Sequence, residues 1–166
     1  MRKHGEYLTA LSNIDKEVHN KLEYFIKSYP NTIILGNGGS NAIATHMAQD
    51  YTKLLGKKAI SFSDPIKLSC YANDYGWDNA YQKFLIENWD QKTFTILISS
   101  SGESQNIINC QKFLIDNNCE YGILTGFGSD NTLHTNADLD TVKFNVNSDD
   151  YGIIECTHQI ILHSIL

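Results

Sequence analysis

Two turns of small residues in this chain have the composition of an anion-binding site. The first turn, residues 36–40, has the sequence Gly-Asn-Gly-Gly-Ser and lies between the apolar run 33–35 and a helical pattern that begins at Ser40. Glycines let the backbone turn and approach a ligand closely. The free N–H groups and the dipole at the start of a helix attract an anion, most often a phosphate. The first turn is therefore a candidate phosphate site, although a glycine-rich turn can also serve packing alone.

The second turn, residues 99–104, repeats this arrangement later in the chain. It reads Ser-Ser-Ser-Gly-Glu-Ser and lies between the apolar run 93–99 and a helical pattern with Ile107, Ile108 and Leu114 on its apolar face. Hydroxyl groups at the start of a helix can bind an anion. One or two serines could merely cap the helix, but four serines around a glycine exceed what capping requires. A repeated strand, small-residue turn and helix predicts an anionic ligand more strongly than either turn alone.

Histidine and acidic residues recur at helical spacing in two parts of the chain. His46 and Asp50 are four residues apart, which puts an imidazole and a carboxylate on one helical face, about one turn beyond the anion. Glu155 and His163 are eight residues apart in the last helical pattern and share roughly one face. Taken singly, His46 could be satisfied by a neighbour, and His163 could be a core or interface histidine. The combined spacing favours a functional site.

Neither turn matches a nucleotide-binding motif. Gly36 and Gly38 fit the first two positions of the dinucleotide fingerprint, but Asn41 stands where the third small residue belongs. No Lys-Ser or Lys-Thr pair follows the glycines, which argues against a nucleotide-triphosphate loop. The sequence therefore predicts no nucleotide cofactor.

Alternating strand and helix patterns predict the elements that must position these residues. Apolar runs predict strands at 33–35, 58–62, 93–99, 120–125 and 139–146, the last nearer an edge. Helical periodicity predicts one long helix over 7–25, stopped by Pro30, and a last helix from Tyr151. Such alternation is typical of an α/β fold, a parallel sheet with helices on both faces. Ligands bind beyond the carboxyl ends of its strands, so both turns should lie together.

The segment 70–77 allows two interpretations. It reads Cys-Tyr-Ala-Asn-Asp-Tyr-Gly-Trp, and Asn-Asp pairs favour turns and helix caps. It is therefore either a connection between helices or a loop over the ligand, with Asp74 reaching a sugar hydroxyl. The helical pattern 81–89 follows, with Phe84 and Leu85 facing inward.

The size and charge of the chain exclude some classes of molecule as binding partners. The 166 residues predict one domain, and the net charge of −6, with Arg2 as the only arginine, makes nucleic acid and anionic membranes poor partners. No apolar run is long enough to span a bilayer, and residues 1–6 lack a signal-peptide core, so we expect a cytoplasmic protein. The cysteines form no Cys-x-x-Cys pair and are expected to be free, mostly buried thiols: Cys70, Cys110, Cys119 and Cys156.

Four segments of the chain resemble the sugar isomerase (SIS) domain family, and within it the phosphoheptose isomerases. They are residues 36–40, 72–76, 98–104 and 148–163. The resemblance covers nearly the whole chain. It implies a single SIS domain over 1–166 with a flavodoxin-like three-layer sandwich around about five parallel strands. It also implies a homotetramer with shared active sites, in which the leading helix, 6–28, makes oligomer contacts.

The resemblance also implies roles for residues of both turns and of the two helices. Phosphate would be bound by Ser99, Ser100, Ser101 and Ser104. The sugar would be bound by Asn37, Gly38, Gly39, Ser40 and Asp74. Some family members hold zinc with a His and a Glu four apart and a Gln and a His eight apart. At these positions the chain has His46, Asp50, Glu155 and His163, so Asp50 and Glu155 depart from the pattern. Two carboxylates and two imidazoles remain a ligand set for Zn²⁺ or another divalent ion.

The implied activity is aldose–ketose isomerisation of a sugar phosphate, with sedoheptulose 7-phosphate giving D-glycero-D-manno-heptose 7-phosphate. Asp50 would carry a proton between adjacent carbons, and His163 would move protons to and from the oxygens. The product would supply heptose for lipopolysaccharide or capsule. Two alternatives remain: an isomerase of another sugar phosphate, or a non-catalytic SIS domain that senses sugar phosphates or binds proteins as an adaptor.

Overall fold

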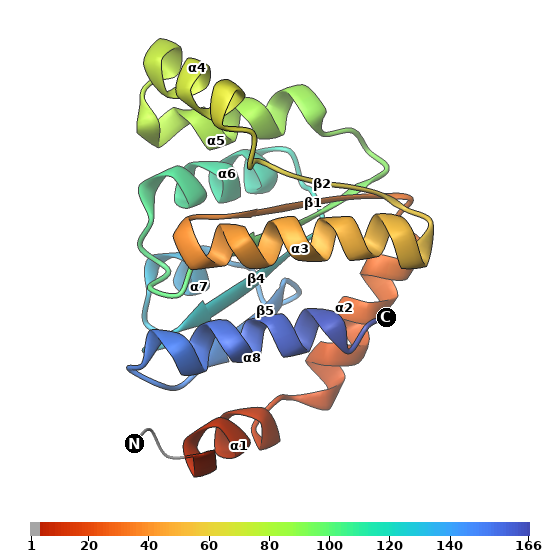
Figure 1. Cartoon of the computed structure of the whole chain (residues 1–166), viewed down its shortest axis with the longest axis vertical. Helices are drawn as coiled ribbons and strands as arrows, with labels where there is room; N and C mark the ends of the chain where they lie inside the picture. The colour runs from red at the N-terminus through yellow and green to blue at the C-terminus, as the bar shows by residue number, and fades with distance from the viewer. Residues whose placement is uncertain (1–3) are drawn as a thin grey trace.

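A five-stranded parallel sheet forms the centre of the computed structural model, which describes residues 4–166 (Figure 1). The strands are β1 Asn31–Gly36, β2 Lys58–Ser61, β3 Thr93–Ile98, β4 Tyr121–Gly126 and β5 Val142–Val146. Their order is β2-β1-β3-β4-β5, and every neighbouring pair is parallel. Strands β3 and β4 are buried along their whole length, whereas β5 alternates because it is an edge strand. The five predicted strands are thereby confirmed.

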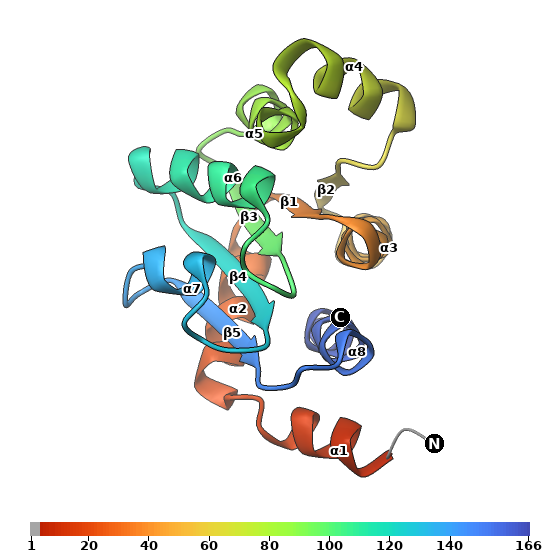
Figure 2. The ribbon, with the colours of Figure 1, turned by 90° about the vertical axis from the view of Figure 1, so that its left-hand side faces the viewer.

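Helices cover both faces of this sheet, as the turned view shows (Figure 2). One layer comprises α2 Lys16–Ser28, α3 Gly38–Leu55 and α8 Tyr151–His163. The other comprises α5 Trp77–Asn88, α6 Gln105–Asp116 and α7 Thr132–Asn136. The first layer packs on Ile34 and Ile96, and the second on Leu35 and Leu97, because successive strand residues point to opposite faces. The three-layer α/β sandwich is therefore as predicted.

Two further helices lie outside these layers. Helix α1, His4–Ser12, packs against α8, and α4, Pro65–Tyr75, packs against α5. Neither contains a fully buried residue. No helix within residues 4–166 is both long enough and apolar enough to cross a membrane.

The strand order brings the two small-residue turns together. β1 and β3 are neighbours, and Gly36 at the end of β1 is in register with Ile98 at the end of β3. From these ends the chain leaves toward opposite faces, into α3 after β1 and into α6 after β3 (Figure 2). This reversal is the topological switch point of a flavodoxin-like sheet, where ligands bind. Both turns lie there.

The predicted long helix over 7–25 is wrong in one respect, because the structure divides it into α1 and α2. Residues 13–15 separate the two helices. Asp15 is the reason: its carboxylate accepts hydrogen bonds from the N–H groups of Glu17 and Val18, at 2.8 and 3.2 Å, and so starts a new helix. The apolar residues keep a heptad-like spacing across the break, so periodicity alone did not reveal the break.

Two smaller predictions are also corrected. Segment 70–77 contains the connection between helices that one interpretation predicted, but it is limited to Gly76: α4 runs to Tyr75, and Gly76, with a φ of 76°, joins it to α5. Asp64 starts α4 by capping it, with Pro65 in its first turn. The thiols are free as expected, but only Cys110 is buried, whereas Cys70 and Cys156 are exposed.

Candidate functional site

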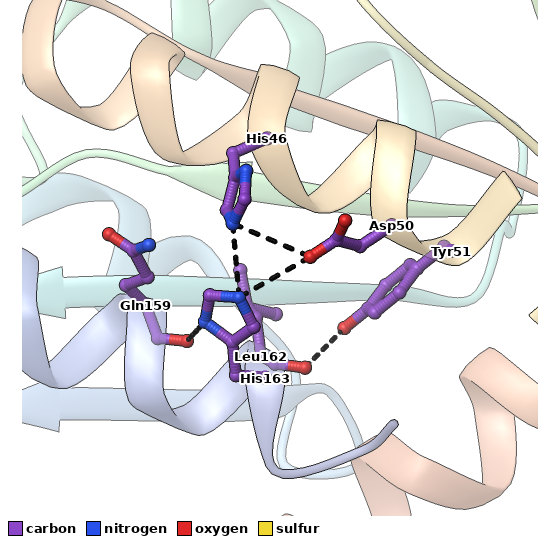
Figure 3. Close-up of polar contacts among 6 residues, drawn as sticks. All are labelled: His46, Asp50, Tyr51, Gln159, Leu162 and His163. Carbon is purple, nitrogen blue, oxygen red and sulfur yellow. Dashed lines mark hydrogen bonds and ion pairs between the residues drawn. The ribbon is translucent and has the colours of Figure 1, made fainter. Parts of the chain in front are cut away.

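A cluster of three side chains lies between α3 and α8. His46 Nε2 is 3.1 Å from His163 Nε2, and each nitrogen is 3.4 Å from Asp50 Oδ2 (Figure 3). The side chains of His46, Asp50 and His163 are 50%, 21% and 36% exposed. The structure therefore brings together three of the four residues that the resemblance assigned to metal binding, and it does so within one chain.

Two hydrogen bonds from side chains to backbone carbonyls hold this cluster in place. The buried Tyr51 hydroxyl donates to the Leu162 carbonyl at 2.9 Å and so joins α3 to α8 beside Asp50 and His163. Burial raises the pKa of Tyr51, which keeps its hydroxyl a donor. His163 Nδ1 lies 3.1 Å from the Gln159 carbonyl (Figure 3). Because a carbonyl only accepts, Nδ1 carries a proton, and Nε2 is the ring nitrogen that faces the cluster.

The donor set of the cluster fits a divalent metal ion. One ligand atom from each of His46, Asp50 and His163 lies within 4.8 Å of the other two. Two imidazoles and a carboxylate are a common ligand set for catalytic zinc, with a further position left for substrate or water. The same groups are also competent acids and bases for proton transfer.

Glu155, the fourth predicted ligand, lies apart from this cluster. It is eight residues before His163, roughly 12 Å along α8. Its two carboxylate oxygens instead lie against Gly39, where an added Cβ would be 2.5 Å from Oε1 and 2.6 Å from Oε2. The partly buried Glu155 thus faces the start of α3 rather than the histidines.

Helices α3 and α6 begin without a side-chain cap. Asn37 and Ser104 stand at their N-cap positions, and neither side chain bonds to the amides of its own helix. Four other helices are capped by carboxylate or amide oxygens, namely those of Asp15, Asp64, Asn131 and Asp150, whereas α5 begins after Gly76 and also has no side-chain cap. The first N–H groups of α3 and α6 are therefore available to a ligand, at the two turns where the sequence predicts an anion.

A pair of asparagines joins the two turns. Asn37 Nδ2 donates to Asn106 Oδ1, and Asn106 Nδ2 donates to Asn37 Oδ1, both at 2.9 Å. Asn106 is 2% exposed and lies in the first turn of α6. Sequence reasoning missed Asn106, and it assigned Asn37 to the sugar, whereas both amide atoms of Asn37 bond to Asn106.

The serines of the second turn differ in their partners. The Ser99 hydroxyl donates to Ser104 Oγ at 3.2 Å, and Ser101 Oγ accepts from the Glu103 N–H at 3.2 Å. Ser100 is 6% exposed, and its hydroxyl has no partner within residues 4–166. A buried hydroxyl without a partner is costly, so Ser100 is suited to bond a ligand at this turn.

Helix α7 holds the second turn in shape. The Glu103 carboxylate accepts hydrogen bonds from the N–H and the hydroxyl of Thr132, both at 2.7 Å, and these bonds lower the pKa of Glu103. Gly102 has a φ of 68°, and a Cβ at this position would be 2.0 Å from Asn131 Oδ1. Only glycine fits there, which fixes the close approach of the turn to α7.

Asp74 is another predicted site residue that this chain keeps apart from the cluster. It lies in the last turn of α4, where it accepts hydrogen bonds from Asn73 Nδ2 at 3.0 Å and Cys70 Sγ at 3.5 Å. Figures 1 and 2 both place α4 at one end of the molecule, with α3 between it and α8. Asp74 therefore does not meet His163 of the same chain.

Comparisons with known proteins concern the sequence and the fold rather than the site. No protein-family model matches the sequence. The phosphoheptose isomerase of Fusobacterium nucleatum subsp. nucleatum is 36% identical over 98 residues, which are 56% of this chain and 50% of that protein. The chain thus spans about half the length of the curated relatives it matches.

Solved structures extend the likeness to the whole fold. Phosphoheptose isomerase GmhA from Neisseria gonorrhoeae has a TM-score of 0.84 at 22% identity and covers 97% of this chain and 92% of its own. The Vibrio vulnificus NanR protein, complexed with ManNAc-6P, has a TM-score of 0.71 at 14% identity and covers 97% of this chain and 58% of its own. In fold the chain is therefore similar to both proteins, and over 98 residues it is related in sequence to curated phosphoheptose isomerases.

Proposed function

We propose that this protein is an aldose–ketose isomerase of a sugar phosphate, which converts sedoheptulose 7-phosphate to D-glycero-D-manno-heptose 7-phosphate. One observation carries the proposal. Two uncapped helix starts meet at the switch point of the sheet, and the cluster of His46, Asp50 and His163 lies farther along α3 and α8. The sequence relationship to phosphoheptose isomerases supports the choice of sugar.

In this proposal the phosphate binds at the second turn. The N–H groups at the start of α6 and the hydroxyls of Ser99, Ser100, Ser101 and Ser104 hold it. The N–H groups of Gly38, Gly39 and Ser40 bind oxygens of the sugar chain. This binding supplies position rather than chemistry, because it holds the reacting carbons beside the cluster.

The cluster performs the proton transfers. Asp50 Oδ2 faces both histidines, whereas Oδ1 has no partner within the described chain and is free to act as a base. Oδ1 takes a proton from C1 of the ketose while the C2 oxygen gains one, which gives an enediol. Return of the carbon-bound proton to C2 and loss of the O1 proton give the aldose. His163 Nε2, when it holds no metal ion, exchanges the oxygen-bound protons.

A divalent ion such as Zn²⁺ fits this site. His46, Asp50 and His163 would hold it, and Glu155 is not among the ligands that we propose. When bound, the ion would supply a Lewis acid that stabilises the oxyanion of the enediolate. No nucleotide cofactor is needed for this chemistry.

We further propose a homotetramer of single SIS domains in the cytoplasm, with active sites shared between subunits. The absence of fully buried residues in α1 and α4 supports such contacts, because amphipathic helices normally bury one face. Asp74 on α4 would then reach the sugar of a neighbouring subunit. Neither nucleic acid nor membrane is a partner in this proposal.

The experiment compares the wild-type protein with Asp50→Asn. The wild type, with and without added Zn²⁺, should convert sedoheptulose 7-phosphate to the aldose, measured by NMR. Asp50→Asn should lower turnover by about 10²- to 10⁴-fold and leave sugar-phosphate affinity, measured by calorimetry, nearly unchanged. Asp116→Asn, an exposed carboxylate at the end of α6, is the control and should keep full turnover. A wild type that leaves the ketose unchanged under all conditions contradicts the proposal.

A second candidate function is a non-catalytic sensor of sugar phosphates. The fold shared with NanR, whose structure contains ManNAc-6P, favours it, as does the replacement of a longer base by Asp50. A sensor would bind sugar phosphate in both the wild type and Asp50→Asn but would show no turnover in either.

A further inference from the structure

The carboxylate of Glu155 fills the space above the first turn. Both of its oxygens lie so close to Gly39 that a Cβ there would be only 2.5 and 2.6 Å from them. Gly39 is exposed, and Glu155 is partly buried in the second turn of α8. The contact therefore depends on two residues: a glycine that leaves the space open, and a side chain long enough to reach it.

No cation of the described chain neutralises this carboxylate. Within residues 4–166, no lysine, arginine or histidine nitrogen lies within 4.0 Å of Glu155, and its oxygens accept no hydrogen bond. The feature that faces it is the start of α3, whose dipole is positive and whose first amides lack a side-chain cap. Glu155 is thus a negative charge held beside an open helix start.

Such a charge makes the two helix starts unequal. Without it, the first N–H groups of α3 and of α6 would both attract a phosphate dianion. With it, a phosphate at α3 would lie beside a like charge, whereas neutral hydroxyl and carbonyl oxygens could still accept from the same amides. The start of α6 has four serines, and the one carboxylate of that turn, Glu103, is held toward α7 by its hydrogen bonds from Thr132.

We propose that Glu155 is a specificity-determining residue, a fixed negative charge that excludes phosphate from the start of α3 and directs it to the serine turn. The phosphate position in turn decides which end of the sugar points along α3 and α8 toward His46, Asp50 and His163. The inference rests on the proposed binding of a sugar phosphate and deepens it. It also assigns a role to Glu155, which lies outside the cluster.

The test uses inorganic phosphate as the probe and a carboxylate placed at the other turn. Ser104→Asp puts an acid at the N-cap of α6, where aspartate is a favoured cap, so the fold should be kept. Binding is followed by calorimetry with a chelator present, and backbone amide NMR signals locate the phosphate at residues 38–40 or 105–106. The full chain is used throughout.

The expected pattern is specific to this proposal. The wild type binds one phosphate at α6, and Ser104→Asp weakens binding at least tenfold. Adding Glu155→Gln to Ser104→Asp restores binding at least tenfold, now at residues 38–40. The matched control adds Glu120→Gln, an exposed carboxylate before β4, to Ser104→Asp and restores nothing.

Three outcomes would overturn the inference: phosphate at residues 38–40 in the wild type, no restoration by Glu155→Gln, or equal restoration by Glu120→Gln. If Ser104→Asp fails to fold, Glu155→Gln alone decides, because it should gain a second phosphate at residues 38–40. The measurement needs no turnover. An active isomerase without restoration therefore removes only the inference, whereas restoration in a protein without turnover removes only the catalytic function.

Discussion

Asn37 and Asn106 donate to each other's side-chain oxygens at 2.9 Å, and this reciprocal pair ties the turn after β1 to the helix after β3. Each amide uses its oxygen and one N–H on the other. The two turns, which are at least 59 residues apart in sequence, are therefore held at one separation, and the ligand groups of one turn keep their place relative to the other. In the proposed function, Asn106 would therefore be a positioning residue that acts on the ligand through Asn37.

Asn106→Ala should both destabilise the fold and weaken binding. It leaves the Asn37 amide without its partner, and the loss should lower the free energy of unfolding by about 1 to 2 kcal/mol, measured in urea. The KM for sugar phosphate should rise more than kcat falls, because the residue positions the turns. In a cycle with Asn37→Ala, the two losses should couple by about 1 kcal/mol. Fully additive losses would contradict the pairing. Asn117→Ala, whose exposed amide bonds only to the Phe113 carbonyl, is the control.

Tyr51→Phe tests the link between α3 and α8. The substitution removes one hydroxyl and leaves the buried Leu162 carbonyl without its donor, so the free energy of unfolding should fall by about 1 to 2 kcal/mol. Because Leu162 precedes His163, Zn²⁺ affinity measured by chelator competition should fall severalfold as well. Tyr24→Phe, at a ring that is 66% exposed, should change neither quantity. Unchanged Zn²⁺ affinity in Tyr51→Phe would mean that the cluster is held without this bond.

His158 should make the fold sensitive to mild acid. Its ring is fully buried, Nε2 donates to the Thr125 carbonyl at 2.9 Å, and burial lowers its pKa from 6.5 to about 4. Below pH 6.5 the unfolded chain binds a proton that the folded chain refuses until about pH 4, so stability falls as pH falls through this window. The contribution between pH 7 and pH 5 is about 2 kcal/mol.

Urea unfolding at pH 7 and pH 5 checks this prediction. His158→Gln should be less stable at pH 7, but its further loss on going to pH 5 should be about 2 kcal/mol smaller than that of the wild type. His19→Gln, which removes a partly buried ring bonded to Ser164 Oγ, is the control and should keep the wild-type pH dependence. Parallel pH profiles for the wild type and His158→Gln would show that His158 is not the cause.

Gly39→Ala should displace the Glu155 carboxylate. The new Cβ would lie 2.5 Å from Oε1, and the flexible glutamate must move aside. Phosphate should then appear at residues 38–40, as for Glu155→Gln, in amide NMR spectra. Gly5→Ala is the matched control, because a Cβ in α1 meets nothing within 4 Å. It should leave the phosphate sites unchanged and favour its helix by up to about 1 kcal/mol. Wild-type spectra for Gly39→Ala would contradict the contact.

The sequence was sufficient for the sheet because its signals are local. Apolar runs such as those around Ile34, Leu97 and Ile123 are bounded by turn residues, and their alternation with helices predicts parallel strands. The alternation of buried and partly buried residues along β5 could be predicted for the same reason. The break at Asp15 was missed because the apolar residues keep their helical spacing on both sides of this N-cap, and the spacing alone does not reveal it.

The site was only partly predictable because it depends on how separate helices are rotated against each other. Spacing put His46 and Asp50 on one face of α3, and the structure brings His163 to them. The same spacing rule put Glu155 on the face of His163, yet eight residues are more than two turns, and the packing of α8 takes Glu155 to Gly39 instead. Asn106 could not be predicted from local sequence, because its partner, Asn37, lies in the other turn, 69 residues away in the sequence.

Helices α3 and α6 start on amides that no side chain completes, although the chain caps other helices with its own oxygens. In the proposed complex, the phosphate would complete the cap of α6, and neutral oxygens of the sugar would complete that of α3. The melting temperature should therefore rise with the fraction of the protein that has sugar phosphate bound, so its measurement reports that fraction.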